Sequence, residues 1–362
     1  MRTILNVVGA RPNFMKIAPI HRRILERGDV RPILVHTGQH YDQKMSHAFF
    51  TELGMPEPDQ FLGVGSGTHA EQTGAVMIAI ERLLLDLKPD LVVVVGDVNS
   101  TLAAALAAAK LHVPIAHVEA GLRSRDRTMP EEVNRILTDA LAEWLFITEQ
   151  SGWDHLRAEG MAAHKMHFVG NVMIDSLREH LDKARACPVM EELGLSPREY
   201  ALVTLHRPSN VDNPLLLDTI LAALEELQRE LTIVFPVHPR TEKMIAQFGF
   251  TPRLEAMKNL IRIEPLGYLA FLRLMSEAAY LLTDSGGIQE ETTWLDVPCL
   301  TLRESTERPV TVTLGSNRLV PLETGAIIEH AAMARSGLLK RKRIPPLWDG
   351  RASERIVNIL LS

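Results

Sequence analysis

Three acidic residues stand where apolar runs in the first half of the chain give way to polar turns. Asp97 ends the stretch VVVVGD, Glu119 lies in AHVEAG, and Glu131 follows a proline at the start of a helical pattern. Each has a local explanation, since Asp97 could cap the next helix, Glu119 could pair with Arg123, and a carboxylate suits any helix start. Together, three acids at the carboxyl edge of one parallel sheet favour general acid–base chemistry.

The stretch LLTDSGGIQEETTW carries a second set of chemical groups. Ser285, Gly286 and Gly287 leave a predicted strand and open a helix, where free backbone N–H groups and the helix dipole favour a phosphate. The alternative is a serine cap with tight packing of helix on strand. Glu290 suits the early helix, whereas Glu291 cannot share its face. A carboxylate one turn inside such a helix can accept both ribose hydroxyls, so we expect a nucleoside diphosphate with Glu291 on its ribose.

Basic residues and histidines also follow predicted strands. The first turn, GARPNFMK, lacks the GxGxxG spacing, so a nicotinamide or flavin dinucleotide is not indicated. Arg11 and Lys16 place positive charge over a strand-to-helix crossover and suit a pyrophosphate, although solvation at the surface would also explain Lys16. His206 and His238 end successive strands of the second half. Each could merely cap a turn, but together they favour contact with a phosphate or a leaving group, His206 first because an arginine adjoins it.

The elements that must position these residues are expected strands and helices. Along the sequence, apolar runs alternate with segments of helical period. Continuous apolar strands separated by helices indicate parallel sheets covered on both faces, so the predicted fold class is α/β with two Rossmann-like doubly wound domains. We expect an N-terminal domain over residues 1–170 with the acids, a C-terminal domain over 171–350 that binds the nucleotide, and a segment 351–362 that packs back on the first domain. The predicted strands are 3–8, 32–37, 91–97, 114–120 and 143–148, then 200–206, 231–238, 260–266, 279–285 and 298–304.

Length, net charge and cysteine content argue against several classes of protein. The 362 residues exceed what one hydrophobic core usually serves, and no apolar stretch is long enough to cross a bilayer, so no membrane partner is expected. A net charge of −6 argues against a general nucleic-acid binder. Cys187 and Cys299 give neither a disulfide framework nor a metal-ligand cluster, and no HExxH spacing occurs. We therefore expect a cytoplasmic protein without a metal.

A series of motifs, in order along the chain, resembles those of the non-hydrolysing UDP-N-acetylglucosamine 2-epimerases. The motifs are GARPNFMKIAP, GDVNSTLAAALAA, HVEAGLRS, MPEEVNR, GNVMIDSL, LHRPSN, and LTDSGGIQEE followed by ERP and LGSNRLV. The resemblance runs from the first strand to about residue 330, nearly the whole chain. It implies a fold of the glycosyltransferase-B type with the active site in the interdomain cleft, a homodimer, and no cofactor, neither metal nor nicotinamide.

The resemblance also implies a reaction. Members of this family interconvert UDP-GlcNAc and UDP-ManNAc by eliminating UDP to a glycal intermediate and adding it back, with the C2 proton replaced on the opposite face. The assignment of base and acid stays open because both directions must run. The residues that match the family are Asp97, Glu119 and Glu131 as essential acids, His206 near the leaving group, Arg11, Ser285, Gly286 and Gly287 on the phosphates, Glu291 on the ribose, and Lys16, Arg135 and Arg308 at further motif positions.

The chain departs from the family pattern at two places. The usual HRRE reads HRPS at residues 206–209, which removes any contact of the second arginine. Many bacterial members are activated by their substrate at a separate site; there the chain keeps Gln39 but has Asp42 for a glutamine and Ala75 for an arginine. Without that guanidinium a second diphosphate lacks its bidentate clamp, so we predict no activation by UDP-GlcNAc.

Other interpretations share these motifs. HTGQHYDQKMS, GTHAEQTG and RSRDRTMPEE also resemble the branch acting on UDP-2,3-diacetamido-2,3-dideoxy-glucuronic acid, whose extra carboxylate Arg125 or Arg127 could meet. We place UDP-GlcNAc first because DSGGIQEE and ERP follow its branch. A hydrolysing 2-epimerase, a glycosyltransferase and a non-catalytic nucleotide-sugar sensor remain as alternatives. The three acids argue against a sensor, because carboxylates hinder binding of a dianionic diphosphate unless they do chemistry.

Overall fold

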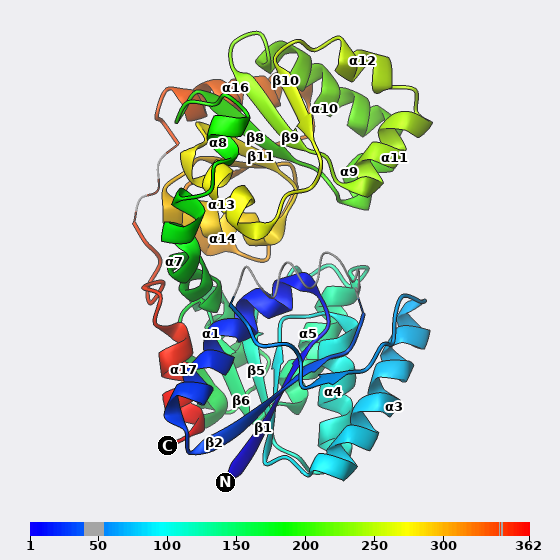
Figure 1. Cartoon of the computed structure of the whole chain (residues 1–362), viewed down its shortest axis with the longest axis vertical. Helices are drawn as coiled ribbons and strands as arrows, with labels where there is room; N and C mark the ends of the chain where they lie inside the picture. Colours follow the sequence, from blue (N-terminus) through cyan, green and yellow to red (C-terminus); the bar gives the residue numbers. More distant parts are fainter. Residues whose placement is uncertain (40–53, 340, 342) are drawn as a thin grey trace. The chain divides into compact units, whose positions relative to one another are not determined.

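The computed structural model describes residues 1–39, 54–339, 341 and 343–362, and for Arg11 the backbone alone. Asp42 therefore lies outside the described residues. The chain splits into two compact units, Met1–Glu179 with Pro346–Ser362, and His180–Pro345 (Figure 1). Each unit is built on its own parallel sheet, which confirms the predicted α/β fold class.

The first unit has the strand order β3-β2-β1-β4-β5-β6-β7 within the described residues. The order reverses direction between β1 and β4, which makes the carboxyl ends of these strands the expected place for a ligand. The strands are β1 (Arg2–Val8), β2 (Val30–His36), β3 (Gln60–Phe61), β4 (Leu91–Val95), β5 (Ile115–Ala120), β6 (Trp144–Ile147) and β7 (Met166–Phe168). The helices are α1 (Arg11–Arg27), α3 (His69–Leu87), α4 (Asn99–Lys110), α5 (Pro130–Leu141), α6 (Gln150–Ala158) and α17 (Ala352–Leu360). The helix α7 (Val172–Arg185) begins in this unit and includes the boundary to the second.

Helices cover both faces of this first sheet. Right-handed crossovers place α1 on one face and α3, α4 and α5 on the other, with α4 packed between its two neighbours. The alanines of α4 are buried, and their small side chains allow this close packing. The C-terminal helix α17 packs beside α1 (Figure 1). Its first turn is held by the buried Asp175, which accepts hydrogen bonds from the N–H groups of Ala352 at 3.1 Å and Ser353 at 2.7 Å.

The second unit has the strand order β10-β9-β8-β11-β12-β13 within the described residues, with an order reversal between β8 and β11. Apolar side chains of the sheet and of α10 and α16 form its core. Its strands are β8 (Tyr200–Thr204), β9 (Thr232–Pro236), β10 (Leu260–Ile263), β11 (Tyr280–Thr283), β12 (Cys299–Thr301) and β13 (Asn317–Leu319). Its helices are α8 (Val189–Glu192), α9 (Pro208–Val211), α10 (Pro214–Leu227), α11 (Pro239–Gln247), α12 (Thr251–Glu255), α13 (Tyr268–Glu277), α14 (Gly286–Leu295), α15 (Pro309–Thr313) and α16 (Thr324–Arg335).

The ten predicted strands are all present, and most end one to three residues before the predicted end. The reason is that polar residues such as Asp97, His206 and Asp284 belong to the turns that follow the strands. Three short strands, β3, β7 and β13, were not predicted because two or three residues carry too little apolar periodicity. Across the described ranges, no helix combines the length and apolar character needed to span a bilayer.

Candidate functional site

Two of the predicted acids share one cation at the carboxyl edge of the first sheet. A terminal nitrogen of Arg135, on α5, lies 2.8 Å from Asp97 Oδ2 and 2.8 Å from Glu119 Oε1. Lys16, on α1, reaches the other side of the same carboxylate, with Nζ 2.5 Å from Glu119 Oε2. The structure therefore brings Lys16, Asp97, Glu119 and Arg135 together, and we call these four residues the acid cluster.

The exposure of its four side chains shows how the charges of the acid cluster are stabilised. Lys16, Glu119 and Arg135 are buried, whereas the Asp97 side chain is 25% exposed. A buried charge is tolerated only when it is paired and hydrogen-bonded, and each of these charges has a partner of opposite sign. Solvation at the surface, the alternative considered for Lys16, is therefore wrong.

The backbone around the acid cluster adopts unusual conformations. Glu119 has φ 71°, in the left-handed region that costs a non-glycine residue about 1–3 kcal/mol, and the pairing of β5 with β6 shifts register between Val118 and Ala120. Gly96, just before Asp97, has φ 67°, and a Cβ there would lie 3.4 Å from Lys16 Nζ. Both strand ends are thus bent where the carboxylates leave the sheet.

The alternative explanation for Glu119, an ion pair with Arg123, is wrong. Arg123 instead places a terminal nitrogen 2.7 Å from Asp139 Oδ2 and 2.6 Å from Glu159 Oε2. Glu119 is free to bind Lys16 and Arg135 because its left-handed backbone turns it away from its sequence neighbour. Spacing along the chain could not reveal this choice.

The other two predicted residues of this unit, Glu131 and Arg11, lie at the starts of α5 and α1. Glu131 lies in the first turn of α5 and is exposed, and it shares a helical face with Arg135 four residues later. Asp97 does not cap α4 with its side chain, because Val98 is the N-cap residue. Arg11 opens α1, and its side chain lies outside the described part of the chain.

In the second unit, the buried Asp284 organises the turn that carries His206. Asp284 Oδ2 accepts the backbone N–H groups of His206 at 3.0 Å and Arg207 at 2.9 Å, and its Oδ1 lies 2.8 Å from His206 Nδ1. Burial alone raises the pKa of Asp284, but the hydrogen bonds and charge of His206 outweigh it and lower that pKa. The histidine ring is fixed through Nδ1, which leaves Nε2 for another partner. Asp284 directly precedes the SGG motif at a predicted strand end, but its role in holding His206 was not predicted.

His238 lies beside His206, with ring centroids 5.7 Å apart. Its Nδ1 accepts the N–H of Arg240 at 3.2 Å and so caps α11. Burial lowers the pKa of His238, and the charge of His206 lowers it further. The capping role that sequence analysis held as an alternative is therefore present, together with the predicted proximity of the two rings.

The start of α14 carries the residues predicted to bind a phosphate. Ser285 is the N-cap residue, as the alternative interpretation held, although its side chain makes no cap hydrogen bond. Arg308 lies against this helix start, since a Cβ at Gly286 would come within 2.9 Å of a terminal nitrogen of Arg308. Ser285, Gly286, Gly287 and Arg308 thus gather positive potential at one point.

Two adjacent glutamates in α14 have different partners. Glu290 Oε1 lies 2.9 Å from Nε of Arg308, so the expectation that Glu290 mainly serves its own helix is corrected. Glu291 Oε1 accepts a hydrogen bond from the hydroxyl of Tyr268 at 3.0 Å. Burial, with a smaller contribution from the charge of Glu290, raises the pKa of Glu291 to about 7, although the Tyr268 hydrogen bond opposes the shift. Tyr268 was missed because no motif surrounds it.

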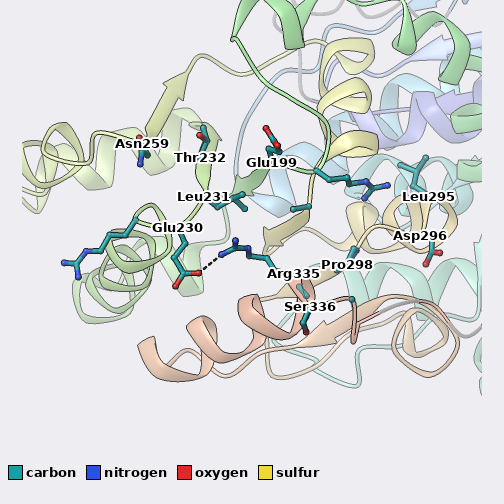
Figure 2. Close-up of a pocket in the computed structure, with 15 residues that line it drawn as sticks. Glu199, Glu230, Leu231, Thr232, Asn259, Leu295, Asp296, Pro298, Arg335 and Ser336 are labelled. Atoms are coloured by element: carbon teal, nitrogen blue, oxygen red, sulfur yellow. Dashed lines mark hydrogen bonds and ion pairs between the residues drawn. The ribbon is translucent and has the colours of Figure 1, made fainter.

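An open cavity of about 1120 Å³ lies at the opposite edge of the second sheet (Figure 2). Its lining includes Glu199, Thr232 and Pro298, which stand at the amino ends of β8, β9 and β12, and an ion pair joins Glu230 to Arg335. Ligands of parallel α/β sheets bind at the carboxyl ends, so this cavity is not the expected nucleotide site. Among the described side chains, no group of three or more His, Cys, Asp or Glu could hold a metal ion.

The structure defines a class of α/β proteins with two parallel sheets, one with paired acids at its carboxyl edge and the other followed by a Ser-Gly-Gly helix start beside Arg308. The family model described as UDP-N-acetylglucosamine 2-epimerase matches residues 22–361. A UDP-N-acetylglucosamine 2-epimerase of Methanocaldococcus jannaschii is 44% identical over 361 residues, which cover 98% of this chain and 97% of that protein. The chain therefore belongs to the UDP-N-acetylglucosamine 2-epimerase family.

Two further similarities bear on structure and substrate. The crystal structure of a Methanocaldococcus jannaschii UDP-GlcNAc 2-epimerase in complex with UDP-GlcNAc and UDP has a TM-score of 0.90 at 42% identity, covering 99% of both chains. A UDP-2,3-diacetamido-2,3-dideoxy-D-glucuronate 2-epimerase of Pseudomonas aeruginosa is 43% identical over 332 residues, 91% of this chain and 91% of that protein. Identities of 44% and 43% do not separate the two substrates.

Proposed function

We propose that this chain interconverts UDP-N-acetylglucosamine and UDP-N-acetylmannosamine without a cofactor, by eliminating and re-adding UDP. The pairing of Asp97 and Glu119 on one guanidinium is the observation that carries the proposal. Such a pair places proton-transfer groups on rigid strand ends, in a chain that matches family members over its full length.

The reaction sets two demands on the site. The C2 proton is not acidic in the ground state and leaves only as the C1–O bond breaks and positive charge builds at C1. The site must therefore stabilise the departing UDP and place carboxylates on both faces of the sugar. When UDP returns to C1, a proton delivered to the opposite face of C2 gives the epimer.

We assign the first demand to the second unit. The N–H groups at Ser285, Gly286 and Gly287, with Arg308, bind the diphosphate, and Glu291 accepts the ribose hydroxyls. His206, held through Nδ1 by Asp284, offers Nε2 to the leaving oxygen, and His238 lies beside it. Arg11 and Lys16 supply further positive charge to the diphosphate.

The second demand falls to the acids of the first unit. Asp97 and Glu131 are accessible, whereas the buried Glu119 is held between Lys16 and Arg135. The three carboxylates exchange protons with C2 and with other positions of the sugar. Both directions of the reaction use the same three carboxylates. A homodimer that binds a UDP-sugar is the proposed assembly, and the free cysteines Cys187 and Cys299 favour the cytoplasm.

The Pseudomonas aeruginosa relative favours UDP-2,3-diacetamido-2,3-dideoxy-glucuronic acid as the second candidate substrate. Turnover of both UDP-sugars, followed by chromatography of the products, separates the candidates. We expect UDP-ManNAc from UDP-GlcNAc, with the higher kcat/KM of the two. Preferred turnover of the diacetamido-uronic acid would transfer the proposal to that substrate, and free ManNAc with free UDP would identify a hydrolysing enzyme.

A further inference from the structure

The first unit contains a buried histidine that the proposed reaction does not use. His117, on β5, is fully buried, and so is its partner Asp139 on α5. Its Nδ1 lies 2.7 Å from Asp139 Oδ1, and its Nε2 lies 2.7 Å from the carbonyl oxygen of Gly96. Both ring nitrogens therefore face oxygen atoms.

The identity of these oxygens fixes the protons on the ring. A backbone carbonyl only accepts hydrogen bonds, so Nε2 must donate to Gly96. Asp139 Oδ2 accepts the N–H of Gly121 at 3.1 Å and lies 2.7 Å from a nitrogen of Arg123. These donors favour the ionised carboxylate, and the Oδ1 of an ionised carboxylate can only accept a hydrogen bond. Nδ1 must then donate as well, and a ring that donates from both nitrogens is an imidazolium.

The charges around this ring balance. Burial alone raises the pKa of Asp139, but the charges and hydrogen bonds of His117 and Arg123 outweigh it and lower that pKa. Arg123 is shared with Glu159, whose Oε2 lies 2.6 Å from the arginine nitrogen. Two buried cations thus stand against Asp139 and the partly exposed Glu159, which is the arrangement that a buried ion pair requires.

The ring joins the two strand ends that carry the acids. Gly96 immediately precedes Asp97, and Gly121, which Asp139 holds, follows Glu119 by two residues. Both turns have left-handed backbone, at Gly96 with φ 67° and at Glu119 with φ 71°, and such conformations persist only where their surroundings hold them. We propose that His117, as a buried imidazolium between Asp139 and Gly96, positions Asp97 and Glu119 for proton transfer.

This inference rests on the proposed function for its kinetic consequence but not for the protonation of the ring. The His117→Asn variant loses the donor to Gly96, and we expect kcat to fall about 10- to 100-fold, as for other partners that orient a reactive group. KM and the Kd for UDP should change less than about threefold, because most of the proposed nucleotide contacts lie in the second unit. Asp139→Asn should act in the same direction. His167→Asn, on β7 of the same sheet, is the matched control and should leave kcat unchanged.

The protonation is measured on the unsubstituted enzyme, so it does not depend on a variant folding or on the substrate. In ¹⁵N-histidine-labelled protein, His117 should give two imidazole N–H correlations, one from each ring nitrogen. The signals are assigned by their loss in His117→Asn, or in His117→Gln if the first variant does not fold. A single N–H at His117 would overturn the imidazolium. A folded variant with full kcat would overturn the positioning role, whereas no turnover by the unsubstituted enzyme would count against the proposed function instead.

Discussion

The functional residues of the two units are constructed in opposite ways. In the first unit, two of the proposed reactive carboxylates, Asp97 and Glu119, are half-buried or buried and paired with cations. In the second unit, two carboxylates lie behind groups proposed to contact the diphosphate and hold them in place, Asp284 for His206 and Glu290 for Arg308, whereas Glu291 is proposed to contact the ribose itself. Proton transfer needs acids at the substrate, and diphosphate binding needs acids kept away from it. Changes in the first unit should therefore reduce kcat, and changes in the second should weaken binding.

The largest effect is expected for Asp97→Asn. The amide keeps the shape of the side chain and can still accept from Arg135, but it cannot exchange a proton with the substrate. We expect kcat to fall about 10²–10⁴-fold, the usual contribution of general acid–base catalysis, while the Kd for UDP stays within about threefold. Steady-state turnover and calorimetric titration measure the two quantities. Asp154→Asn, on the exposed part of α6, is the control; an equal loss of UDP affinity in Asp97→Asn would break the comparison.

The converse change is Glu291→Gln in the second unit. Replacing a carboxylate that accepts two ribose hydroxyls by an amide should weaken UDP binding by about 1.5–3 kcal/mol, which is roughly 10- to 150-fold. At saturating substrate, kcat should change little, because no proton is transferred at this residue. Titration of UDP and measurement of kcat on the same preparation decide between the two. Glu255→Gln, exposed on α12, is the control, and a variant that lost kcat alone would contradict the assignment.

The pH dependence of UDP-GlcNAc binding tests the role of Glu291 in a second way. Burial raises the pKa of Glu291 to about 7, and the ionised form is the one that accepts ribose hydroxyls. Protonation therefore competes with binding as the pH falls, and affinity should drop about tenfold from pH 8 to pH 6 for a group with this pKa. UDP-GlcNAc titrated into Asp97→Asn avoids turnover during the measurement. The dependence should disappear when Glu291→Gln is added; a dependence of equal size in the double variant would contradict it.

A smaller effect, on stability alone, is expected at the C-terminal helix. Asp175→Ala removes the acceptor that holds the first turn of α17, and the free energy of unfolding should fall by about 1–2 kcal/mol. For a unit of this size that lowers Tm by about 2–8 °C, with kcat unchanged. Calorimetry measures the shift. Glu354→Gln, which removes an exposed ion pair with Arg351, should change stability by less than about 1 kcal/mol, and equal shifts for both variants would show that the cap contributes nothing special.

The smallest expected effect is that of UDP-GlcNAc as an activator, which should be absent. Ala75 is exposed on α3 where activated relatives would carry an arginine, so UDP-GlcNAc should not activate the enzyme. Conversion of UDP-ManNAc should start at full rate without added UDP-GlcNAc. Strict dependence on a trace of UDP-GlcNAc would show that other residues supply the missing clamp.

Much of this organisation could be predicted because strands and strand-end residues leave local signals. Four valines before Asp97 and the SGG turn before a helix are visible in the sequence, and the structure places both at strand ends. The residues that hold functional side chains in place left no such local signal in the sequence. Asp139, Asp284 and Tyr268 act on residues 18 to 78 positions away, so only the folded chain reveals their partners. The choice of Arg135 over Arg123 as the partner of Glu119 likewise depends on a left-handed backbone that spacing cannot show.

Proton NMR of UDP-GlcNAc with the enzyme in D₂O tests the central claim most directly. Elimination and re-addition of UDP predicts UDP-ManNAc with deuterium at C2, and deuterium at C2 of the remaining UDP-GlcNAc. The reason is that in every turnover the C2 proton is transferred to a carboxylate that exchanges with solvent. Asp97→Asn should abolish this exchange while still binding UDP. UDP-ManNAc formed with its C2 hydrogen retained, or no exchange and no new sugar, would contradict the account.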